Sequence, residues 1–281
     1  MDLQVVRQVD ELGAWIAEGD VVVLSGAGLS TDSGIPDYRG PSGSARRSTP
    51  MTYQTFTRDP IARRRYWARS HLGWRTIGEA QPNDGHRAVA DLQSSGALTG
   101  IITQNVDGLH QAAGATDVVE LHGNLARITC LDCGELTPRE VLAGRLDAAN
   151  PTFDGVATAL NADGDAELAD EELDGFAVVD CTTCGGLLKP DVVYFGETVP
   201  PDRVSRSFAT VTAAKTLLVL GSSLTVMSGR RFVLRAVKDG IRVAVVNRGV
   251  TRGEAYASLL IDAPLGIVLP HLARQLAPVS P

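Results

Sequence analysis

Residues 21–40 read VVVLSGAGLSTDSGIPDYRG, and this segment decides the fold. Its first four residues are branched and apolar, which predicts a short strand buried on both faces of a parallel sheet. The small residues Ser25, Gly26, Ala27 and Gly28 follow at once. Small residues at that place let backbone amides approach a phosphate, and a helix beginning there would add the positive end of its dipole. The segment therefore predicts a nucleotide site.

A glycine-rich turn alone is weak evidence, because an ordinary strand-to-helix turn has the same composition and the third glycine of the dinucleotide fingerprint is missing. The continuation of the loop favours a ligand site. Gly34-Ile35-Pro36 predicts an extended, stiffened loop that sets Asp37 and Arg39 beside the turn. An ordinary turn needs no such appendage.

The chain has 281 residues, a length that favours one large domain with an inserted smaller one. It is 44% hydrophobic and 21% charged, which is typical of a globular protein. Its net charge of −7 gives no support to a nucleic-acid binder or to a polybasic membrane binder. The N-terminal residues are charged and amphipathic, and later apolar runs are too short to span a bilayer. We therefore expect a cytoplasmic protein.

Periodicity predicts helices over residues 1–20, 83–95 and 201–214, and strands over 100–103, 118–121, 216–220 and 243–246. Residues 41–75 carry eight arginines and one acid interleaved with aromatic residues, which predicts a separate helical module. A solvated helical face explains that composition better than nucleic-acid binding does, given the net charge.

Several expected strands end in small or polar residues, namely Ser25, Gln104, His122, Gly221 and Asn247. The carboxyl ends of parallel strands are where open α/β sheets bind ligands. At that edge Asn247 could bond an adenosine ribose hydroxyl, while Ser222 and Ser223 could meet phosphate.

Two CxxC pairs, Cys130 with Cys133 and Cys181 with Cys184, give the most specific chemical signal. Four thiolates on two such turns form a closed tetrahedral zinc site, which is structural. A redox dithiol is the weaker alternative, because neither pair lies at the strand-to-helix junction of a thioredoxin-like unit. Nine acids lie between Asp147 and Asp174, in a segment that we expect to be a flexible linker or a partly ordered loop.

Among the five histidines, His122 follows an expected strand and precedes a glycine at the same sheet edge as the polar loops. This position suits a general base. His110 is the competing candidate, and a purely structural histidine is the remaining alternative.

The motifs together resemble the sirtuin family: GAGLS at 26–30, GIPDYR at 34–39, TQNVDGLH at 103–110, His122-Gly123, the two CxxC pairs, FGE at 195–197 and GSSL at 221–224. The likeness runs in order over residues 21–270. RYWARSHLGW at 65–74, the acidic insert and LKPDVVYFGETV at 188–199 are similar to class II members, which include bacterial proteins and a mitochondrial animal member.

The resemblance implies an α/β fold in which a large Rossmann-like parallel-sheet domain binds NAD⁺. That domain would comprise residues 1–40, 80–125 and 190–281. The inserted small domain would combine a helical module, residues 41–79, with a four-cysteine zinc ribbon that carries the acidic insert, residues 126–189.

The resemblance further implies NAD⁺-dependent removal of acyl groups from lysine side chains of protein substrates, with transfer of the acyl group to ADP-ribose and release of nicotinamide. NAD⁺ is then a co-substrate, and one structural Zn²⁺ is expected. His122 matches the catalytic base and Asn105 the residue that orients the ribose and a water. Asp107 with Ile35 matches the pair that holds the nicotinamide amide.

The residues that match NAD⁺ contacts are Gly26, Ala27, Gly28, Ser30, Ile35, Pro36, Asp37, Tyr38, Arg39, Gln104, Asn105, Val106, Asp107, Gly221, Ser222, Ser223, Asn247, Arg248, Gly249 and Leu265. Tyr38 departs from the phenylalanine of many deacetylases. Substrate-peptide contacts match Val193, Phe195, Gly196 and Glu197, on a strand expected to pair with the peptide backbone.

Tyr66 and Arg69 stand three residues apart and would share one helix face. In class III sirtuins a Tyr and an Arg at this spacing bind the carboxylate of acidic acyl groups, so the resemblance predicts a preference for succinyl or glutaryl lysine. The alternative is that Arg69 lies on a solvated face or bonds the acidic insert at residues 163–174.

Two other functions remain open at this point. A protein mono-ADP-ribosyltransferase would use the same NAD⁺ site and pass the ribosyl group to a protein side chain. A non-catalytic zinc-ribbon binding module is disfavoured, because Asn105, Asp107 and His122 are all present.

Overall fold

The structure is a computed structural model that describes residues 2–37, 50–155, 159–161, 164–167 and 175–277. Its main sheet is parallel, with the strand order β11-β10-β9-β1-β2-β3. The strands are β1 (Val21–Ser25), β2 (Leu98–Thr103), β3 (Val119–Glu120), β9 (Thr216–Leu220), β10 (Arg242–Val246) and β11 (Leu259–Ile261). The predicted Rossmann-like sheet is confirmed, with the first strand near its centre.

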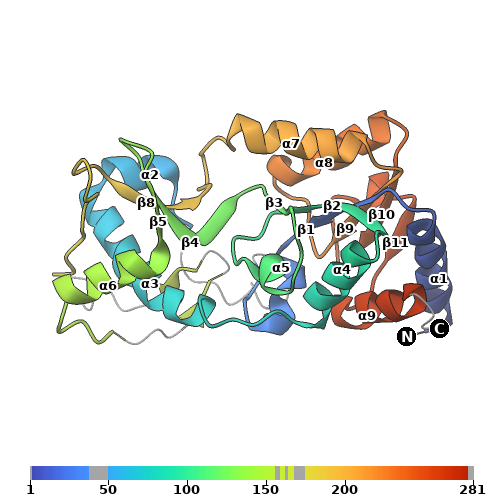
Figure 1. Cartoon of the computed structure of the whole chain (residues 1–281), viewed down its shortest axis with the longest axis horizontal. Helices are drawn as coiled ribbons and strands as arrows, with labels where there is room; N and C mark the ends of the chain where they lie inside the picture. The colour runs from blue at the N-terminus through green and yellow to red at the C-terminus, as the bar shows by residue number, and fades with distance from the viewer. Residues whose placement is uncertain (1, 38–49, 156–158, 162–163, 168–174, 278–281) are drawn as a thin grey trace.

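The burial of β1 follows from its place between β9 and β2. Side chains alternate across a strand, so Val21 and Val23 join one apolar core while Val22 and Leu24 join another. The first core lies under α1 (Leu3–Ala17), α4 (Asp84–Ser94) and α9 (Leu265–Leu276). The second lies under α7 (Pro201–Thr212) and α8 (Met227–Lys238), on the opposite face of the sheet (Figure 1).

The helix expected directly after β1 is absent, and that prediction was wrong. The chain instead makes two short 3₁₀ turns, Ala27–Leu29 and Thr31–Ser33, which end at Gly34 with φ 83°. The amides of Gly26 and Gly28 donate to the carbonyls of Leu220 and Gly221, both at 2.9 Å. These glycines therefore serve the packing of two loops against each other, and their amides are not free for a phosphate.

That packing is tight enough to exclude any side chain. A Cβ on Gly26 would lie 2.8 Å from the Gly221 carbonyl oxygen, and one on Gly28 would lie 2.9 Å from the Gly221 Cα. A Cβ on Gly221, whose φ is 60°, would meet the Leu29 amide nitrogen at 2.6 Å. The loops that end β1 and β9 are thus held in contact, backbone against backbone.

Most other predicted elements are present within a few residues of their expected bounds. The chain leaves its sheet at Val192, and Phe195, in the segment that the resemblance implies to be a strand, makes an isolated bridge with Thr52. The sequence patterns did not predict α5 (Leu109–Ala112), α6 (Arg139–Ala149), α8, α9 or β11.

A second sheet is antiparallel, in the order β5-β4-β8. Its strands are β4 (Gly123–Cys130), β5 (Leu136–Pro138) and β8 (Leu188–Val192), packed with α2 (Tyr53–Arg58), α3 (Pro60–Ile77) and α6 (Figure 1). The expected domain boundaries at 125/126 and 189/190 both fall inside strands of this sheet. Within the acidic segment, β6 (Ala159–Leu160) pairs with β7 (Ala166–Glu167).

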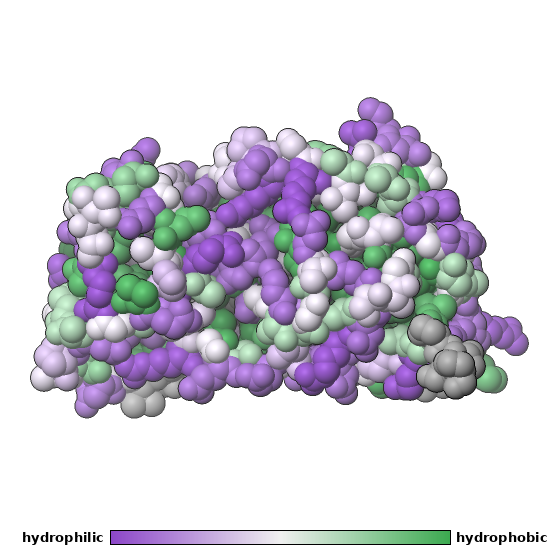
Figure 2. All heavy atoms as spheres, in the orientation of Figure 1, coloured by the Kyte–Doolittle hydropathy of each residue, from purple (hydrophilic) through white to green (hydrophobic). Residues whose placement is uncertain are grey.

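Hydrophilic side chains cover much of the face drawn in Figure 2, and apolar ones show through in separate patches. Among the described helices, none combines the length and apolar character needed to cross a bilayer.

Gly123 joins the main sheet to the second sheet. Its φ is 88°, and a Cβ there would lie 1.8 Å from the Asp191 carbonyl oxygen of the paired strand β8. No side chain fits without separating β4 from β8.

We expect Gly123→Ala to lower the free energy of unfolding by about 2–4 kcal/mol, because it combines backbone strain with a clash against backbone. The control is Gly114→Ala, with φ 98° and open space around the added methyl, which should cost about 1–2 kcal/mol from strain alone. Urea unfolding measures both. Equal losses in the two variants would show that the contact with Asp191 is unimportant.

Candidate functional site

A cavity of about 1320 Å³ opens at the carboxyl ends of β1, β2, β9 and β10. It exceeds the roughly 300–1,000 Å³ typical of small-ligand pockets, so it has room for a dinucleotide and part of a second ligand. Every predicted cofactor residue within the described ranges lines it, from Gly26 in the first loop to Leu265 at the start of α9. Tyr38 and Arg39 lie outside the described residues.

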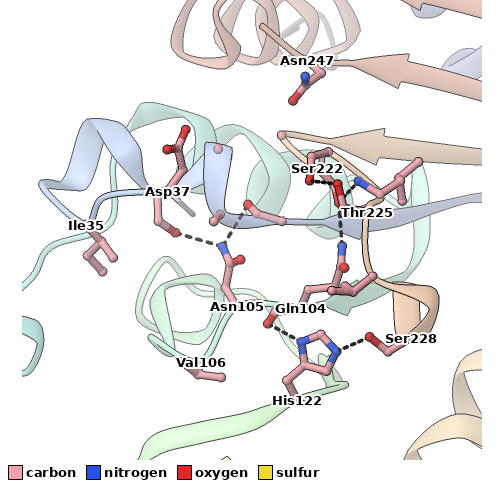
Figure 3. Close-up of a pocket in the computed structure, with 18 of the residues that line it drawn as sticks. Ile35, Asp37, Gln104, Asn105, Val106, His122, Ser222, Thr225, Ser228 and Asn247 are labelled. Carbon is pink, nitrogen blue, oxygen red and sulfur yellow. Dashed lines mark hydrogen bonds between the residues drawn. The ribbon is translucent and has the colours of Figure 1, made fainter. Parts of the chain in front are cut away.

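The loop after β2 supplies Asn105 to one wall of the cavity (Figure 3), and Asp107 of the same loop also lines it. The Asn105 amide nitrogen donates to the Ser30 hydroxyl at 3.0 Å and to the Gly26 carbonyl at 3.1 Å. Its two amide hydrogens are thereby used, so the carboxamide oxygen is the atom it offers to a ligand. The Ser30 hydroxyl in turn donates to Asp107 at 2.7 Å.

Asp107 is tied down at both carboxylate oxygens, because the Leu109 amide also donates to it, at 2.9 Å. Burial raises the pKa of Asp107, while the bonds from Leu109 and Ser30 lower it. The carboxyl group therefore has a fixed orientation beside the cavity.

The loops after β9 and β10 form the opposite wall. The Ser222 hydroxyl oxygen accepts from the Gln104 side chain at 2.9 Å and from the Leu224 amide at 3.3 Å. Its own hydrogen remains to be donated to an acceptor such as a phosphate oxygen. Asn247, which follows β10, donates to the Gly249 carbonyl at 2.8 Å and presents its side chain at the cavity edge (Figure 3).

His122 lies at the floor of the cavity with both ring nitrogens engaged (Figure 3). Nδ1 lies 2.9 Å from the Gln104 carbonyl oxygen, which can only accept, so Nδ1 carries the hydrogen. Nε2 is then the acceptor, 2.8 Å from the Ser228 hydroxyl. Burial, together with the nearby Arg231 and Arg203, lowers the pKa of His122 to about 4, although the bond to the Gln104 carbonyl raises it. The ring is therefore neutral at neutral pH and has a lone pair at Nε2.

His110, the competing candidate, lies behind the cavity and does not line it. Its Nε2 pairs with the Ser25 hydroxyl at 2.8 Å, and burial lowers its pKa to about 3. His86 packs edge-on against it at 5.3 Å and is fully buried, with a pKa lowered by burial to about 4. Both are structural histidines of the core.

The loop after β8 faces the cofactor loops across the cavity and contains the four remaining predicted substrate residues, Val193, Phe195, Gly196 and Glu197. Beneath it, the buried Lys189 ammonium donates to the Val192 carbonyl at 2.5 Å and to Glu197 at 3.2 Å. Glu197 also accepts from the Tyr194 amide at 2.8 Å. The Glu197 carboxylate therefore holds the shape of this loop.

Tyr66 and Arg69 do not line the cavity, so the structure does not support their predicted substrate role. Tyr66 is 2% exposed and packs edge-on against Phe56 and Tyr194, both at 5.5 Å. Arg69 bonds both carboxylate oxygens of the buried Asp165, with Nε at 3.0 and 3.1 Å. The acidic insert is thus its partner, as the alternative interpretation had it, because a buried carboxylate needs a compensating charge.

The four cysteines form one cluster, with all sulfur atoms within 4.8 Å of one another. The Sγ atoms of Cys130 and Cys184 are 3.6 Å apart, and those of Cys133 and Cys181 are 3.8 Å apart. Zinc–sulfur bonds of about 2.3 Å in a tetrahedron require sulfur–sulfur distances of about 3.8 Å. The donor set and its spacing therefore fit a closed Zn²⁺ site.

The sequence patterns did not reveal several residues of the cavity wall, namely Tyr194, Thr225, Ser228 and Arg231. Ser228 and Arg231 lie on α8, which was not predicted. The apolar spacing of Phe232, Val233 and Ala236, all fully buried, was the available signal for that helix.

The comparison with known proteins agrees with this geometry. The sequence profile of the Sir2 family matches residues 26–228. The NAD-dependent protein deacetylase 1 of Streptomyces coelicolor is 61% identical over 258 residues, which are 92% of this chain and 86% of that protein. The mitochondrial NAD-dependent protein lipoamidase sirtuin-4 of Bos taurus is 46% identical over 253 residues, 89% and 80% of the two chains.

Among solved structures, the complex of Sir2 with a p53 peptide and NAD⁺ is similar, with a TM-score of 0.73 and 28% identity over 95% of this chain and 96% of that one. The matched residues 26–228 include His122, the loops after β1 and β2, and all four cysteines. The chain therefore belongs to the Sir2 family.

Proposed function

We propose that the protein is an NAD⁺-dependent protein lysine deacylase of the deacetylase type. The observation that carries this proposal is the neutral His122, which turns Nε2 to a cavity bounded on one side by nucleotide-type loops and on the other by the loop after β8. A base between two such walls suits the transfer of a group from one ligand to another.

The names of relatives support the same reaction. The Streptomyces protein is a deacetylase and the bovine protein a lipoamidase, so both remove an acyl group from a protein. The similar Sir2 structure holds a peptide and NAD⁺ together. We assign acylated lysine side chains of proteins as the substrate class.

NAD⁺, when bound, supplies the ribose carbon that accepts the acyl oxygen and the nicotinamide that leaves. The chain's own residues orient the co-substrate and remove a proton from its ribose hydroxyl. Asn105 offers its carboxamide oxygen to the ribose or to a water, and Asp107 with Ile35 holds the nicotinamide amide. His122 accepts the proton of a ribose hydroxyl at Nε2, and the Gln104 carbonyl steadies the ring by accepting from Nδ1–H.

The remaining proposed contacts follow the cavity wall. Ser222 donates to phosphate, and Asn247 meets the adenosine end at the edge of β10. Backbone groups of Val193, Phe195 and Gly196 pair with the substrate peptide, in an arrangement that tolerates many peptide sequences. Arg69 is paired with Asp165, so we expect no preference for acidic acyl groups from this residue.

We assign one structural Zn²⁺ to the four cysteines. The metal would join the hairpin turn that follows β4 to the turn that precedes β8, since each turn supplies two thiolates. It would supply no catalysis, because four protein ligands leave no open coordination position.

The function is tested by mass spectrometry on purified protein with NAD⁺ and acetyl- and lipoyl-lysine peptides. We expect deacylated peptide, nicotinamide and acyl-ADP-ribose in equal amounts, and His122→Ala should lower the rate by on the order of 10²-fold, as for loss of a positioned base. NAD⁺ affinity should stay nearly unchanged in that variant, because His122 is one of many residues that line the cavity.

The matched control is His271→Ala on α9, which lies away from the cavity lining and should keep the wild-type rate. ADP-ribosylated protein without acyl-ADP-ribose would instead identify a mono-ADP-ribosyltransferase. Full turnover by folded His122→Ala would remove the base assignment.

For the metal, we expect one zinc per chain by elemental analysis and its loss in Cys130→Ser. That variant should lose at least about 2 kcal/mol of unfolding free energy, because metal binding contributes to folding. Thr182→Ala, an exposed change between the second pair of cysteines, should keep both zinc and stability. Active enzyme without zinc would contradict this assignment.

A further inference from the structure

Ser228 is the second residue of α8, and its hydroxyl does not serve that helix. A serine in the first turn of a helix commonly bonds a nearby backbone amide. Here the cap residue is Val226, and α8 has no side-chain cap. The Ser228 hydroxyl instead lies 2.8 Å from Nε2 of His122, across 106 positions of sequence (Figure 3).

The tautomer of His122 makes this contact consequential. Nδ1–H is committed to the Gln104 carbonyl, so the ring has a single lone pair, at Nε2. The Ser228 hydroxyl donates to that lone pair. A substrate hydroxyl that gives up a proton to the ring must reach the same atom.

We propose that Ser228 is a positioning residue for the base. Its hydroxyl holds Nε2 of His122 toward the cavity, and it yields that place to the ribose hydroxyl when the co-substrate binds. At Nε2 one hydroxyl donor replaces another, and the released Ser228 hydroxyl then donates to water or to the co-substrate at the cavity wall. This inference rests on the proposed role of His122.

The surroundings of His122 favour the neutral ring from several sides. Arg231 faces it from α8 and Arg203 from α7, and Arg203 is paired with Asp191 of β8 at 2.8 Å. From the loop after β8, Glu197 lines the same cavity but pairs with Lys189. From the loop after β2, Gln104 is uncharged and Asp107 is bonded to Ser30.

A donor to the neutral form of a base disfavours its protonation. Removing the Ser228 hydroxyl should therefore raise the pKa of His122, whereas removing a serine that merely packs would leave the ring nitrogens unchanged. This difference separates a positioning role from a structural one.

The first test is ¹⁵N NMR of the imidazoles in protein without NAD⁺, with His122 assigned from a His122→Gln spectrum. In Ser228→Ala we expect the Nε2 resonance to move and the titration to shift upward by about 0.5–1 pH unit, the size expected for one lost hydrogen bond. His86 and His110 are internal controls whose signals should not move. An unchanged Nε2 resonance would overturn the proposal.

The second test is kinetic and includes rescue. Ser228→Ala should lower kcat/KM for NAD⁺ by roughly 3–10-fold, the size expected from one hydrogen bond that orients the ring in the free enzyme, and leave kcat nearly unchanged. Ser228→Thr keeps the hydroxyl and should restore both the NMR signal and the rate. Ser205→Ala, an exposed serine on α7, should behave as wild type.

The outcomes are distinct. A lowered kcat with unchanged kcat/KM for NAD⁺ would place the role of the hydroxyl in the bound complex and overturn the proposal, as would a threonine variant that rescues folding but not kcat/KM. If the NMR shift occurs and wild type shows no deacylation, the proposed function fails while the bond from Ser228 to His122 stands.

Discussion

The contact between the loops that end β1 and β9 is the constraint on which the site depends. Gly26 and Gly28 press against Gly221 at distances that admit no Cβ, and their amides are bonded to carbonyls at the end of β9 and in the loop that follows it. This contact joins the loops of two neighbouring central strands at the carboxyl edge of the main sheet. The cavity opens at these loops, and the side chains of Asn105, Ser222 and His122 also line it.

Sequence patterns predicted the parts of the fold that burial dictates. The run at 21–25 and the strands near 216 and 243 are continuous apolar segments, and such runs have few alternatives in a parallel sheet. The sequence pattern did not predict helix α8, because arginines that reach into the cavity and the solvent separate its apolar residues. The helix expected after β1 failed for another reason, since loop packing at Gly28 overrode the local preference.

The sequence predicted those residues of the candidate site that belong to a recognisable motif in their own loop. Motif order indicated the loops that carry Asn105, His122 and the cysteines, and in the structure Asn105 and His122 line one cavity while the four cysteines form a separate cluster. Pairwise contacts across the chain were not predictable. Helix spacing put Tyr66 and Arg69 on one face, but it could not show that the face turns toward an aromatic core and Asp165. Ser228 likewise carries no signal until α8 is folded beside His122.

Three histidines, His86, His110 and His122, are held neutral at one edge of the main sheet, each with a pKa lowered by burial to about 3 or 4. In an unfolded chain each would titrate near 6.5. Between these values the unfolded chain binds more protons than the folded one, so acid favours unfolding from about pH 6.5 downward. The arrangement that keeps a base ready at neutral pH thus also makes the folded state less stable in acid.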